Sequence, residues 1–376
     1  MVQLKDLRLK YKKLIENQVK KLINLESSHH LLTGSNGPYD DDETWLRGAA
    51  HSISLLSNYY QGVEKNEDII TAIGHLSNSI IESEYYKGGS YFVCRKGNLK
   101  DETNGVIGVA WILEGLANGY SVSKSKTIEK SIIGIIQSLE FNDELKLWHR
   151  PSLKGHSKAS VDMTFNHQLW LAYSISFCNE VLGQDLNKNV IELFESLDKL
   201  ITVKRDGRIQ HAIIRNNLKG YLKNFKTLVK CFIQKKSTKY KEDGYHLFNV
   251  FAFARLKSLG YSNHFENAGW FKKVLRYANS EELFISLTTN NEESDYYSLK
   301  NTSGLVFNRY GIPYNVSGFE YLYVHNVFGL DNLDLAERYL SSQMKCYEDN
   351  NNSKFTEDNV NLYYRLYEYS YNLPMV

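Results

Sequence analysis

Proline and cysteine are both scarce in this chain, which holds four of each among 376 residues. So little proline is typical of a helical protein, because proline removes a backbone donor and breaks a helix in its interior. The cysteines are scattered without a CxxC pair, which indicates reduced core residues rather than a disulfide framework. No uncharged apolar run approaches the ~18 residues that a membrane-spanning helix needs, and the charged N-terminal segment is unlike a signal peptide. We therefore expect a cytoplasmic protein without a transmembrane segment.

The chain also lacks an excess of charge of either sign. Its 45 basic and 43 acidic residues give a formal net charge of +2, so no global field attracts nucleic acid. No GxSxG, P-loop or GxGxxG motif occurs, which leaves hydride and phosphoryl transfer without support. No HxxxH or HxxEH pattern of metal ligands occurs either. We expect no nucleic-acid partner, no cofactor and no metal.

Tyrosine is abundant, with 27 copies against five tryptophans and 17 phenylalanines. Its flat apolar face and polar tip suit a pocket that stacks sugar rings, although the codon usage of an AT-rich genome explains the total equally well. Aromatic, amide and charged side chains gather in six polar turns, each of which opens a strongly apolar helix. The six polar turns span residues 37–47, 97–105, 148–168, 241–249, 314–325 and 355–365.

Apolar residues recur at spacings of three and four along most of the chain, which predicts amphipathic helices. The predicted helices cover about residues 3–25, 41–60, 66–83, 103–120, 125–140, 164–182, 187–201, 243–260, 264–278, 318–329, 332–346 and 357–371. Two kinds alternate. One kind, such as GVIGVAWILEGLANG, is apolar nearly all round and is therefore expected to be buried all round. The other kind, such as VIELFESLDKL, has one apolar stripe and a charged face.

Six alternations of inner and outer helices predict an all-α fold, an (α/α)6 toroid whose repeated hairpins place their polar turns at one shared mouth. The inner helices are expected to begin near residues 41, 103, 164, 244, 318 and 357. Short β-hairpin insertions at 84–100 and 202–215, and a basic insertion at about 216–241, interrupt the repeats, and 285–313 is expected to be irregular. No low-complexity linker divides the chain, so we expect one domain over residues 1–376.

One polar stripe runs along the first inner helix. Its members recur at steps of three and four: Glu43, Arg47, His51, Ser54 and Asn58. An unpaired buried charge costs several kcal/mol, so the stripe is expected to face a wet cavity. The aspartates at 40–42 stand at the positive end of this helix, where carboxylates are favoured. Alternatively, one of them caps the helix and another pairs with Arg47.

Two further segments carry candidate groups. Glu114 is the lone acid within VAWILEGLA, so it is either salt-bridged to a neighbouring helix or an acid of raised pKa. A long polar connection in a compact fold is more often functional than structural, which draws attention to residues 148–168. That connection and the start of the helix after it contain Trp148, His149, Arg150, His156, Lys158, Asp162, Asn166 and His167.

Five segments of the chain resemble, in order, the family of AglQ-like proteins, which are encoded in archaeal N-glycosylation and bacterial surface-polysaccharide gene clusters. The segments are NGPYDDDETWLRGAAH, NGVIGVAWILEGL, DMTFNHQLW, DGYHLFNVFAFA and YNVSGFEY, between about residues 36 and 325. The family is similar to the wider six-hairpin glycosidase-like superfamily of glycoside hydrolases, unsaturated uronyl hydrolases and sugar epimerases. The resemblance implies a glycan-processing role. Matching residues are Asp41, Asp42, Arg47, His51, Asp162, Asn166, His167, His246 and Glu320.

The leading hypothesis is an enzyme of surface polysaccharide or glycan biosynthesis, an epimerase or a glycoside hydrolase, that acts on a free or lipid-linked sugar or oligosaccharide. Hydrolysis needs two carboxyl groups, about 5–5.5 Å or 6.5–9.5 Å apart. Asp42 with Asp162 is the first pair, and Asp101 or Glu320 are alternates. Epimerisation needs two proton-transfer groups with pKa values near neutrality. The candidates for these groups are the histidines His51, His149, His167 and His246, or the many tyrosines.

The predicted catalytic residues are therefore Asp42, Asp162 and His167. The predicted sugar-binding residues are Asp41, Arg47, His51, Trp148, His149, Arg150, Asn166, His246 and Glu320. The alternative hypothesis is a non-catalytic glycan-binding or scaffold protein of a polysaccharide assembly complex. In that protein the basic insertion at 216–241 would dock a partner or an anionic lipid-linked sugar.

Overall fold

The computed structural model divides the chain into two compact units. The first unit comprises residues 1–162, 170–191 and 347–376, and the second comprises residues 163–169 and 192–346. Within them the structure describes residues 2–25, 31, 33–36, 41–97, 101–153, 159–186, 188–214, 238–289, 298–300, 306–347 and 360–373. Most of the basic insertion expected at 216–241 lies outside the described residues, and so do His156, Lys158 and Asp40.

The first unit is built mainly from helices, with two short antiparallel strand pairs. Its helices are α1 (Val2–Ile23), α2 (Leu46–Gly62), α3 (Glu67–Ile81), α4 (Val106–Ser123), α5 (Lys126–Gln137) and α16 (Val360–Ser370). The strand pairs are β1 (Ser35–Asn36) with β2 (Asp41–Asp42) and β3 (Phe141–Asn142) with β4 (Leu147–Trp148). Two helices cross the boundary between the units along the chain: α6 (Phe165–Leu182) and α7 (Asn189–Glu195).

The second unit repeats the helical design. Its helices are α8 (Leu197–Leu200), α10 (Thr238–Gly244), α11 (His246–Ser258), α12 (Gly269–Ala278), α13 (Glu281–Thr288), α14 (Ser317–Phe328) and α15 (Leu333–Met344), with a 3-10 helix, η3, at Ser262–His264. One antiparallel strand pair joins β5 (Ser298–Lys300) to β6 (Val306–Asn308), with Leu299 opposite Phe307.

Burial confirms the predicted alternation of two kinds of helix. In α4 every residue from Val106 to Gly119 is buried, whereas α5 buries only four isoleucines at spacings of one, three and four, Ile128, Ile132, Ile135 and Ile136. The same contrast separates α11 from α12. A helix that is apolar all round can be buried all round, while one apolar stripe supports a single packed face.

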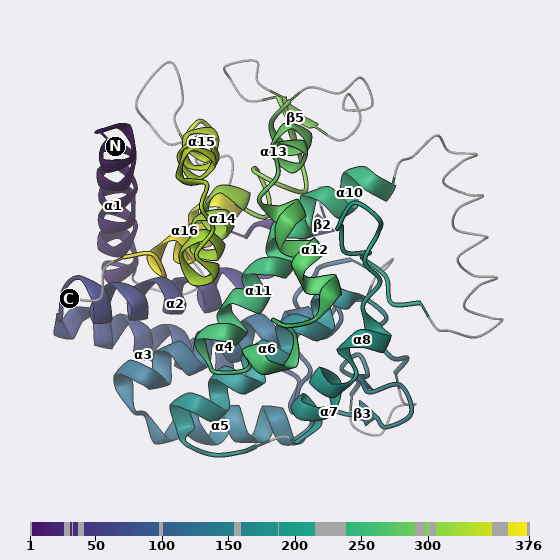
Figure 1. The fold of residues 1–376 in the computed structure, drawn as a ribbon. Coiled ribbons are helices and arrows are strands. Elements are labelled where there is room, and N and C mark those ends of the chain that lie inside the picture. The colour runs from purple at the N-terminus through teal and green to yellow at the C-terminus, as the bar shows by residue number, and fades with distance from the viewer. Residues whose placement is uncertain are drawn as a thin grey trace. The chain divides into compact units, whose positions relative to one another are not determined.

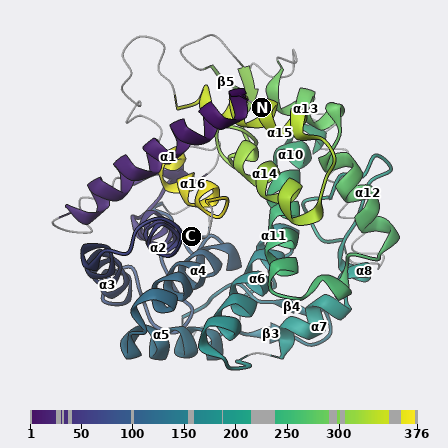
Figure 2. The same cartoon turned by 60° about the vertical axis from the view of Figure 1, so that its left-hand side comes forward.

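The inner helix α2 packs against α3, α4 and α16, and the views in Figure 1 and Figure 2 both place these helices side by side. Glycines permit two of these approaches. A Cβ on Gly115 of α4 would lie 2.7 Å from the Cα of Ala50 in α2, and one on Gly48 of α2 would lie 2.5 Å from the ring of Tyr364 in α16. These contacts bring the polar stripe of α2 against α4 and α16.

Several boundaries differ from those expected. The helix predicted from residue 41 begins at Leu46, because Asp41 and Asp42 pair with β1 instead. The helix predicted over 187–201 is divided into α7 and α8. The segment 285–313, which was expected to be irregular, contains the end of α13 and the strands β5 and β6. The hairpins expected at 84–100 and 202–215 contain isolated bridges, Tyr86 with Phe92 and Val203 with Ile209. No helix among the described residues is both long enough and apolar enough to cross a lipid bilayer.

Candidate functional site

Three charged or titratable side chains form a buried chain along the start of α2. The carboxylate of Glu43 lies 3.1 Å from Nη1 of Arg47, and Nε of Arg47 donates to Nε2 of His51 at 3.2 Å. None of the three is more than 2 % exposed. Because a guanidinium only donates, Nε2 is the lone-pair nitrogen of His51, and its ring proton lies on Nδ1. Burial, followed by the charges of Arg47 and Arg365, holds the pKa of His51 well below its usual value, so the ring is neutral.

Aromatic rings from the neighbouring helices enclose this chain. The guanidinium of Arg47 lies over the ring of Trp111 in α4, 4.2 Å from its centroid. The imidazole of His51 stacks on Tyr367 of α16 with a centroid separation of 4.4 Å and an interplanar angle of 11°. Flat rings beside polar groups provide the kind of surface on which a sugar ring packs.

The remainder of the α2 stripe is satisfied by protein partners. Asn118 of α4 donates to the hydroxyl of Ser54 at 3.1 Å, and Asn58 donates to Ser370 of α16 at 2.8 Å. Neighbouring helices therefore supply the hydrogen bonds of Ser54 and Asn58, and these two residues do not require the water-filled cavity that the sequence predicted.

Glu114 of α4 is fully buried and accepts hydrogen bonds from three tyrosine hydroxyls. Tyr173 of α6 donates to Oε1 at 3.2 Å, Tyr371 donates to the same oxygen at 3.1 Å, and Tyr367 donates to Oε2 at 3.4 Å. Hydrogen bonds to the charged form of a carboxylate stabilise it. The sequence predicted either a salt bridge or a raised pKa for Glu114, and it did not predict phenolic donors.

A second acid and a second arginine enter from α16. Nη2 of Arg365 lies 2.7 Å from Oε1 of Glu368, and neither side chain is more than 1 % exposed. Apart from this ion pair, no donor in the described part of the chain lies within hydrogen-bond distance of either oxygen of Glu368, although the hydroxyl of Tyr367 acts on its charged form from nearby. Burial, with the charge of Glu114 adding to it, raises the pKa of Glu368 to about 8, although Arg365 and Arg47 act in the opposite direction.

We call this group of side chains the buried cluster: Glu43, Arg47, His51, Trp111, Glu114, Arg365, Tyr367 and Glu368. All of its residues belong to the first unit. Of these residues, Arg47 and His51 are predicted site residues, and Glu43 and Glu114 stand out in the sequence, whereas Arg365, Tyr367 and Glu368 are not predicted from it. The signal was present at the end of the sixth polar turn and in the helix after it, where YYRLYEYS places Arg365 and Glu368 three residues apart. A charged pair at that spacing is usually on a solvated helix face, which is why it passed unnoticed.

The other predicted residues of the first unit lie around β2 and β4. Asp42 is exposed in β2, and its carbonyl accepts the N–H of Lys96 at 2.8 Å; Asp41 is half-buried beside it. Trp148 is fully buried and packs edge to face on Phe141 at 5.1 Å.

Next to Trp148, the buried His149 has Nδ1 2.6 Å from the carbonyl of Ala159. Arg150 is partly exposed and lies 3.7 Å from a carboxylate oxygen of Asp101. That aspartate also accepts the N–H groups of Thr103 and Gly105 at 3.0 Å each, so it orders the turn before α4.

Asp162 has a clear structural role. Its side chain is fully buried, and Oδ2 accepts the N–H of Val106, the first residue of α4, at 3.1 Å. The residue at the N-cap of α4 is Gly105, which has no side chain to offer. A carboxylate from 56 positions along the chain therefore caps this helix, where its charge also favours the helix dipole.

Four predicted site residues belong to the second unit: Asn166, His167, His246 and Glu320. His246 is fully buried and donates from Nε2 to the carbonyl of Val274 at 3.1 Å, and burial lowers its pKa to about 4. Asn166 and Glu320 are buried, and His167 is half-buried. The expectation that His167 and His246 line one cavity with Asp42, Arg47, His149 and Asp162 stays a prediction.

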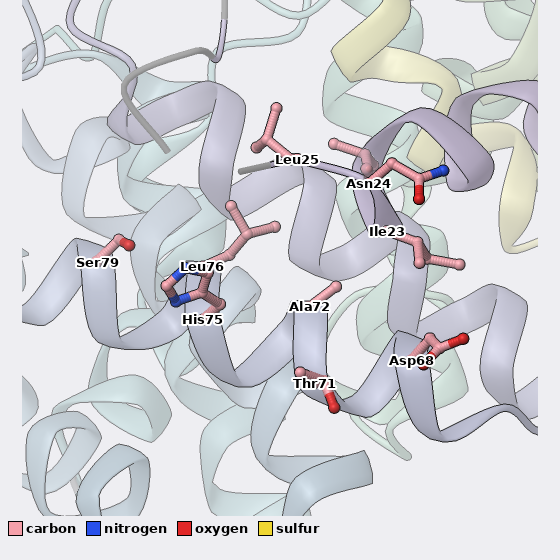
Figure 3. Close-up of a pocket in the computed structure, with 10 residues that line it drawn as sticks. Ile23, Asn24, Leu25, Asp68, Thr71, Ala72, His75, Leu76 and Ser79 are labelled. Carbon is pink, nitrogen blue, oxygen red and sulfur yellow. The ribbon is translucent and has the colours of Figure 1, made fainter. Parts of the chain in front are cut away.

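One pocket of the first unit lies elsewhere. It has a volume of about 380 Å³ and is lined by the end of α1 and by α3, including Asp68, His75 and Ser79 (Figure 3). None of its lining residues belongs to the buried cluster. Within the described ranges, no three histidine, cysteine, aspartate or glutamate side chains are grouped so that they could hold a metal ion.

The fold is similar to the folds of several solved sugar epimerases and of a glucuronyl hydrolase. The chain is similar to a cellobiose 2-epimerase from Bacillus thermoamylovorans B4167, with 14% identity, a TM-score of 0.62, and coverage of 97% of this chain and 99% of that one. It is also similar to a cellobiose 2-epimerase from Spirochaeta thermophila, with 11% identity, a TM-score of 0.59, and coverage of 98% of this chain and 96% of that one. An unsaturated glucuronyl hydrolase specific for heparin has 10% identity and a TM-score of 0.56, with coverage of 98% of this chain and 96% of that one. These likenesses confirm the predicted (α/α)6 fold of the six-hairpin glycosidase-like enzymes.

One similarity in sequence is more specific. The chain is 27% identical over 359 residues to archaeal glycosylation protein Q of Haloferax volcanii, an alignment that covers 89% of this chain and 90% of that protein. The resemblance to AglQ-like proteins is therefore confirmed. No protein-family model matches the sequence.

Proposed function

We propose that this protein is a carbohydrate-active enzyme that acts on a sugar or oligosaccharide of a glycan-assembly pathway, by acid–base chemistry in the buried cluster. The observation that carries the proposal is the enclosure of three carboxyl groups and two guanidinium groups between aromatic rings. The similarity to archaeal glycosylation protein Q supports the glycan pathway, and the similarity in fold to sugar epimerases and a glucuronyl hydrolase supports the reaction class.

The buried cluster has the parts that proton transfer at a sugar requires. A transfer group works best when its pKa lies near the operating pH, and Glu368 has such a pKa. A guanidinium in a water-poor site stabilises negative charge that develops on a neighbouring oxygen, which Arg47 and Arg365 are placed to do. Epimerisation uses both properties at one carbon centre. Hydrolysis uses the acid to protonate the leaving oxygen and needs a second carboxylate, for which Glu43 and Glu114 are available.

Asp42, Asp162 and His167 remain candidate catalytic residues. Asp42 is accessible to solvent, which supports a role at the entrance. Asp162 is committed to the N–H of Val106, so its replacement is expected to act through stability as well as activity. The same substrate assays with Asp42→Asn, Asp162→Asn and His167→Gln test each of them.

Two finer proposals concern the setting. A lipid-linked form of the glycan agrees with the basic insertion at 216–241, of which residues 216–237 lie outside the described part of the chain. A cytoplasmic location agrees with the scattered thiols, since Cys94 and Cys178 are buried and burial raises the pKa of both.

The test is to incubate the purified protein in D2O with free sugars, disaccharides and lipid-linked oligosaccharides, and to follow them by proton NMR. Epimerisation replaces a carbon-bound proton by deuterium and changes one configuration at unchanged chain length. Hydrolysis instead creates a new reducing end. The matched control is Glu129→Gln, which alters the ion pair between the half-buried Glu129 and the exposed Lys126, outside the buried cluster. Binding of a glycan without any turnover would contradict the proposed function and favour a glycan-binding or scaffold protein.

A further inference from the structure

The buried cluster contains more acids than bases. Its carboxyl groups belong to Glu43, Glu114 and Glu368, whereas its guanidinium groups belong only to Arg47 and Arg365. His51 adds no charge, because its lone pair accepts from Arg47. With every acid ionised, the buried cluster itself would hold one negative charge in excess, which is unfavourable away from water, and the half-buried Arg95 outside the cluster offsets that charge only from the side of Glu43. One bound proton removes that charge.

The contacts of the three acids show which of them has room for the proton. Glu43 faces Nη1 of Arg47 with both oxygens, at 3.1 and 3.5 Å. Glu114 accepts from three phenols, which stabilises its ionised form. Glu368 contacts Arg365 through Oε1, and no other donor of the described residues lies within hydrogen-bond distance of its oxygens, so the hydroxyl of Tyr367 only lowers its pKa weakly from nearby. A protonated Oε2 in Glu368 would displace no existing donor.

We propose that Glu368 holds the transferable proton of the buried cluster and is the group that exchanges it with the bound sugar. The role rests on the proposed function. In the forward step the O–H bond of Glu368 breaks and a bond forms between that proton and an oxygen or carbon of the sugar. The carboxylate that remains is stabilised by Arg365, 2.7 Å away. The reverse step returns a proton from the sugar to Glu368, so that one turnover leaves the enzyme unchanged.

A second unpartnered group supports a ligand at this place. The indole nitrogen of Trp111 is buried and has no hydrogen-bond partner within the described chain. The same ring lies against Arg47 and 5.7 Å from His51. A sugar hydroxyl would satisfy this donor, because every hydroxyl carries two acceptor lone pairs.

The charges that face Glu368 come from each helix around it. Arg47 belongs to α2, Glu114 to α4, and Arg365 to α16 itself. Burial and the like charge of Glu114 raise the pKa of Glu368, and the guanidiniums lower it. The phenols of Tyr173, Tyr367 and Tyr371 hold the charge of Glu114 in place by hydrogen bonding.

The experiment is a pH titration of the full-length protein with 13C-labelled glutamate side chains, followed by NMR. We expect one carboxyl signal to titrate near pH 8, to be absent from Glu368→Gln, and to remain in the control Glu129→Gln, which lies outside the buried cluster. Glu368→Gln copies the shape of the protonated acid, so it is expected to fold and to bind the sugar within about twofold of wild type. Its kcat is expected to fall by about 10²–10⁴, the usual contribution of a general acid or base.

A signal near pH 8 that survives in Glu368→Gln places the proton on another acid and overturns the proposal. Wild-type turnover by Glu368→Gln overturns it as well. If wild type converts no sugar, the proposed function fails and the catalytic role falls with it, while the titration still decides where the proton is held. Should Glu368→Gln not fold, Glu114→Gln provides the second variant. Removal of that neighbouring charge is expected to move the titration of the Glu368 signal to lower pH, and an unmoved signal contradicts the proposal.

Discussion

Among single residues, the buried acids of the first unit are stabilised in three different ways. Glu43 is paired with a guanidinium, Glu114 is surrounded by phenolic donors, and Asp162 accepts the first backbone N–H of α4. Each arrangement supplies a donor where water is excluded, since a buried carboxylate without donors is costly. Burial raises the pKa of Glu43 against the opposing charge of Arg47, and it raises that of Glu368, which has fewer donors, to about 8.

The first residue-scale prediction concerns pH. The pKa of Glu368 is raised in the folded protein, so its contribution to stability is present at low pH and is lost as pH rises through about 8. Burial lowers the pKa of His51, so this residue makes the free energy of unfolding rise with pH, but only below its unfolded pKa of ~6.5. Between about pH 6.5 and 8 the wild type should therefore lose roughly 1.4 kcal/mol per pH unit relative to Glu368→Gln. Urea unfolding at three pH values measures this difference, and parallel curves for the two proteins would contradict it.

The second residue-scale prediction concerns the helix cap. Asp162→Ala removes the acceptor of the Val106 N–H and is expected to cost about 1–2 kcal/mol of unfolding free energy. Asp162→Asn keeps an oxygen and should cost less. Asp42→Ala at an exposed position is the control, expected within about 0.5 kcal/mol of wild type. Equal stability of Asp162→Ala and wild type in chemical denaturation would show that the cap does not matter.

Among elements, α2 is the helix around which the first unit is organised. It packs against α1, α3, α4 and α16, and its polar stripe meets partners on α4 and α16. The approach of α2 to α4 is close enough to involve backbone atoms, because Gly115 has no side chain. The geometry of the buried cluster depends on that approach.

The element-scale prediction uses two glycines. Gly115→Ala places a Cβ 2.7 Å from the Cα and carbonyl oxygen of Ala50, so α4 must move away, at an expected cost of about 1–3 kcal/mol. Gly134→Ala in α5 meets nothing within 4 Å and is expected to stabilise the helix by about 0.5–1 kcal/mol. Thermal unfolding of both variants measures the contrast. A stabilised Gly115→Ala protein would mean that α2 and α4 are not so closely packed.

For the whole molecule, the two ends of the described chain meet in the first unit. Tyr11 of α1 contacts Tyr369 of α16 at 4.7 Å and Tyr347 at 6.3 Å between ring centroids. The segment that contributes Arg365 and Glu368 is therefore held partly by the N-terminal helix. The fold is shared with sugar epimerases and a uronyl hydrolase at 10–14% identity, so it supports several chemistries, and the site residues distinguish them.

The whole-molecule prediction tests this closure. Tyr11→Ala removes a fully buried ring and is expected to cost about 3–5 kcal/mol, as large-to-small core changes do. Amide exchange in α16 should become faster, because its partner is lost. Leu9→Ala, at a position that is 68% exposed, is the control and should leave both stability and exchange close to wild type. Unchanged exchange in α16 of Tyr11→Ala would show that α1 does not hold that helix.

The helices, their inner or outer character and the fold class followed from the sequence, because periodicity and burial are properties of neighbouring residues. Thus the all-round apolar pattern of residues 106–119 predicted a buried helix, and the isoleucine stripe of α5 predicted one packed face. Arg47 and His51 were found in the same way, as polar residues on an apolar helix.

The partners of those residues were decided by the tertiary structure alone. Glu114 meets tyrosines that lie 59, 253 and 257 positions away, and Asn58 meets Ser370 at a separation of 312. No local pattern encodes such pairs, because the chain path and not the spacing brings them together. For the same physical reason Asp162 looked like a catalytic acid in sequence, and only its position beside the first turn of α4 showed that it also caps a helix.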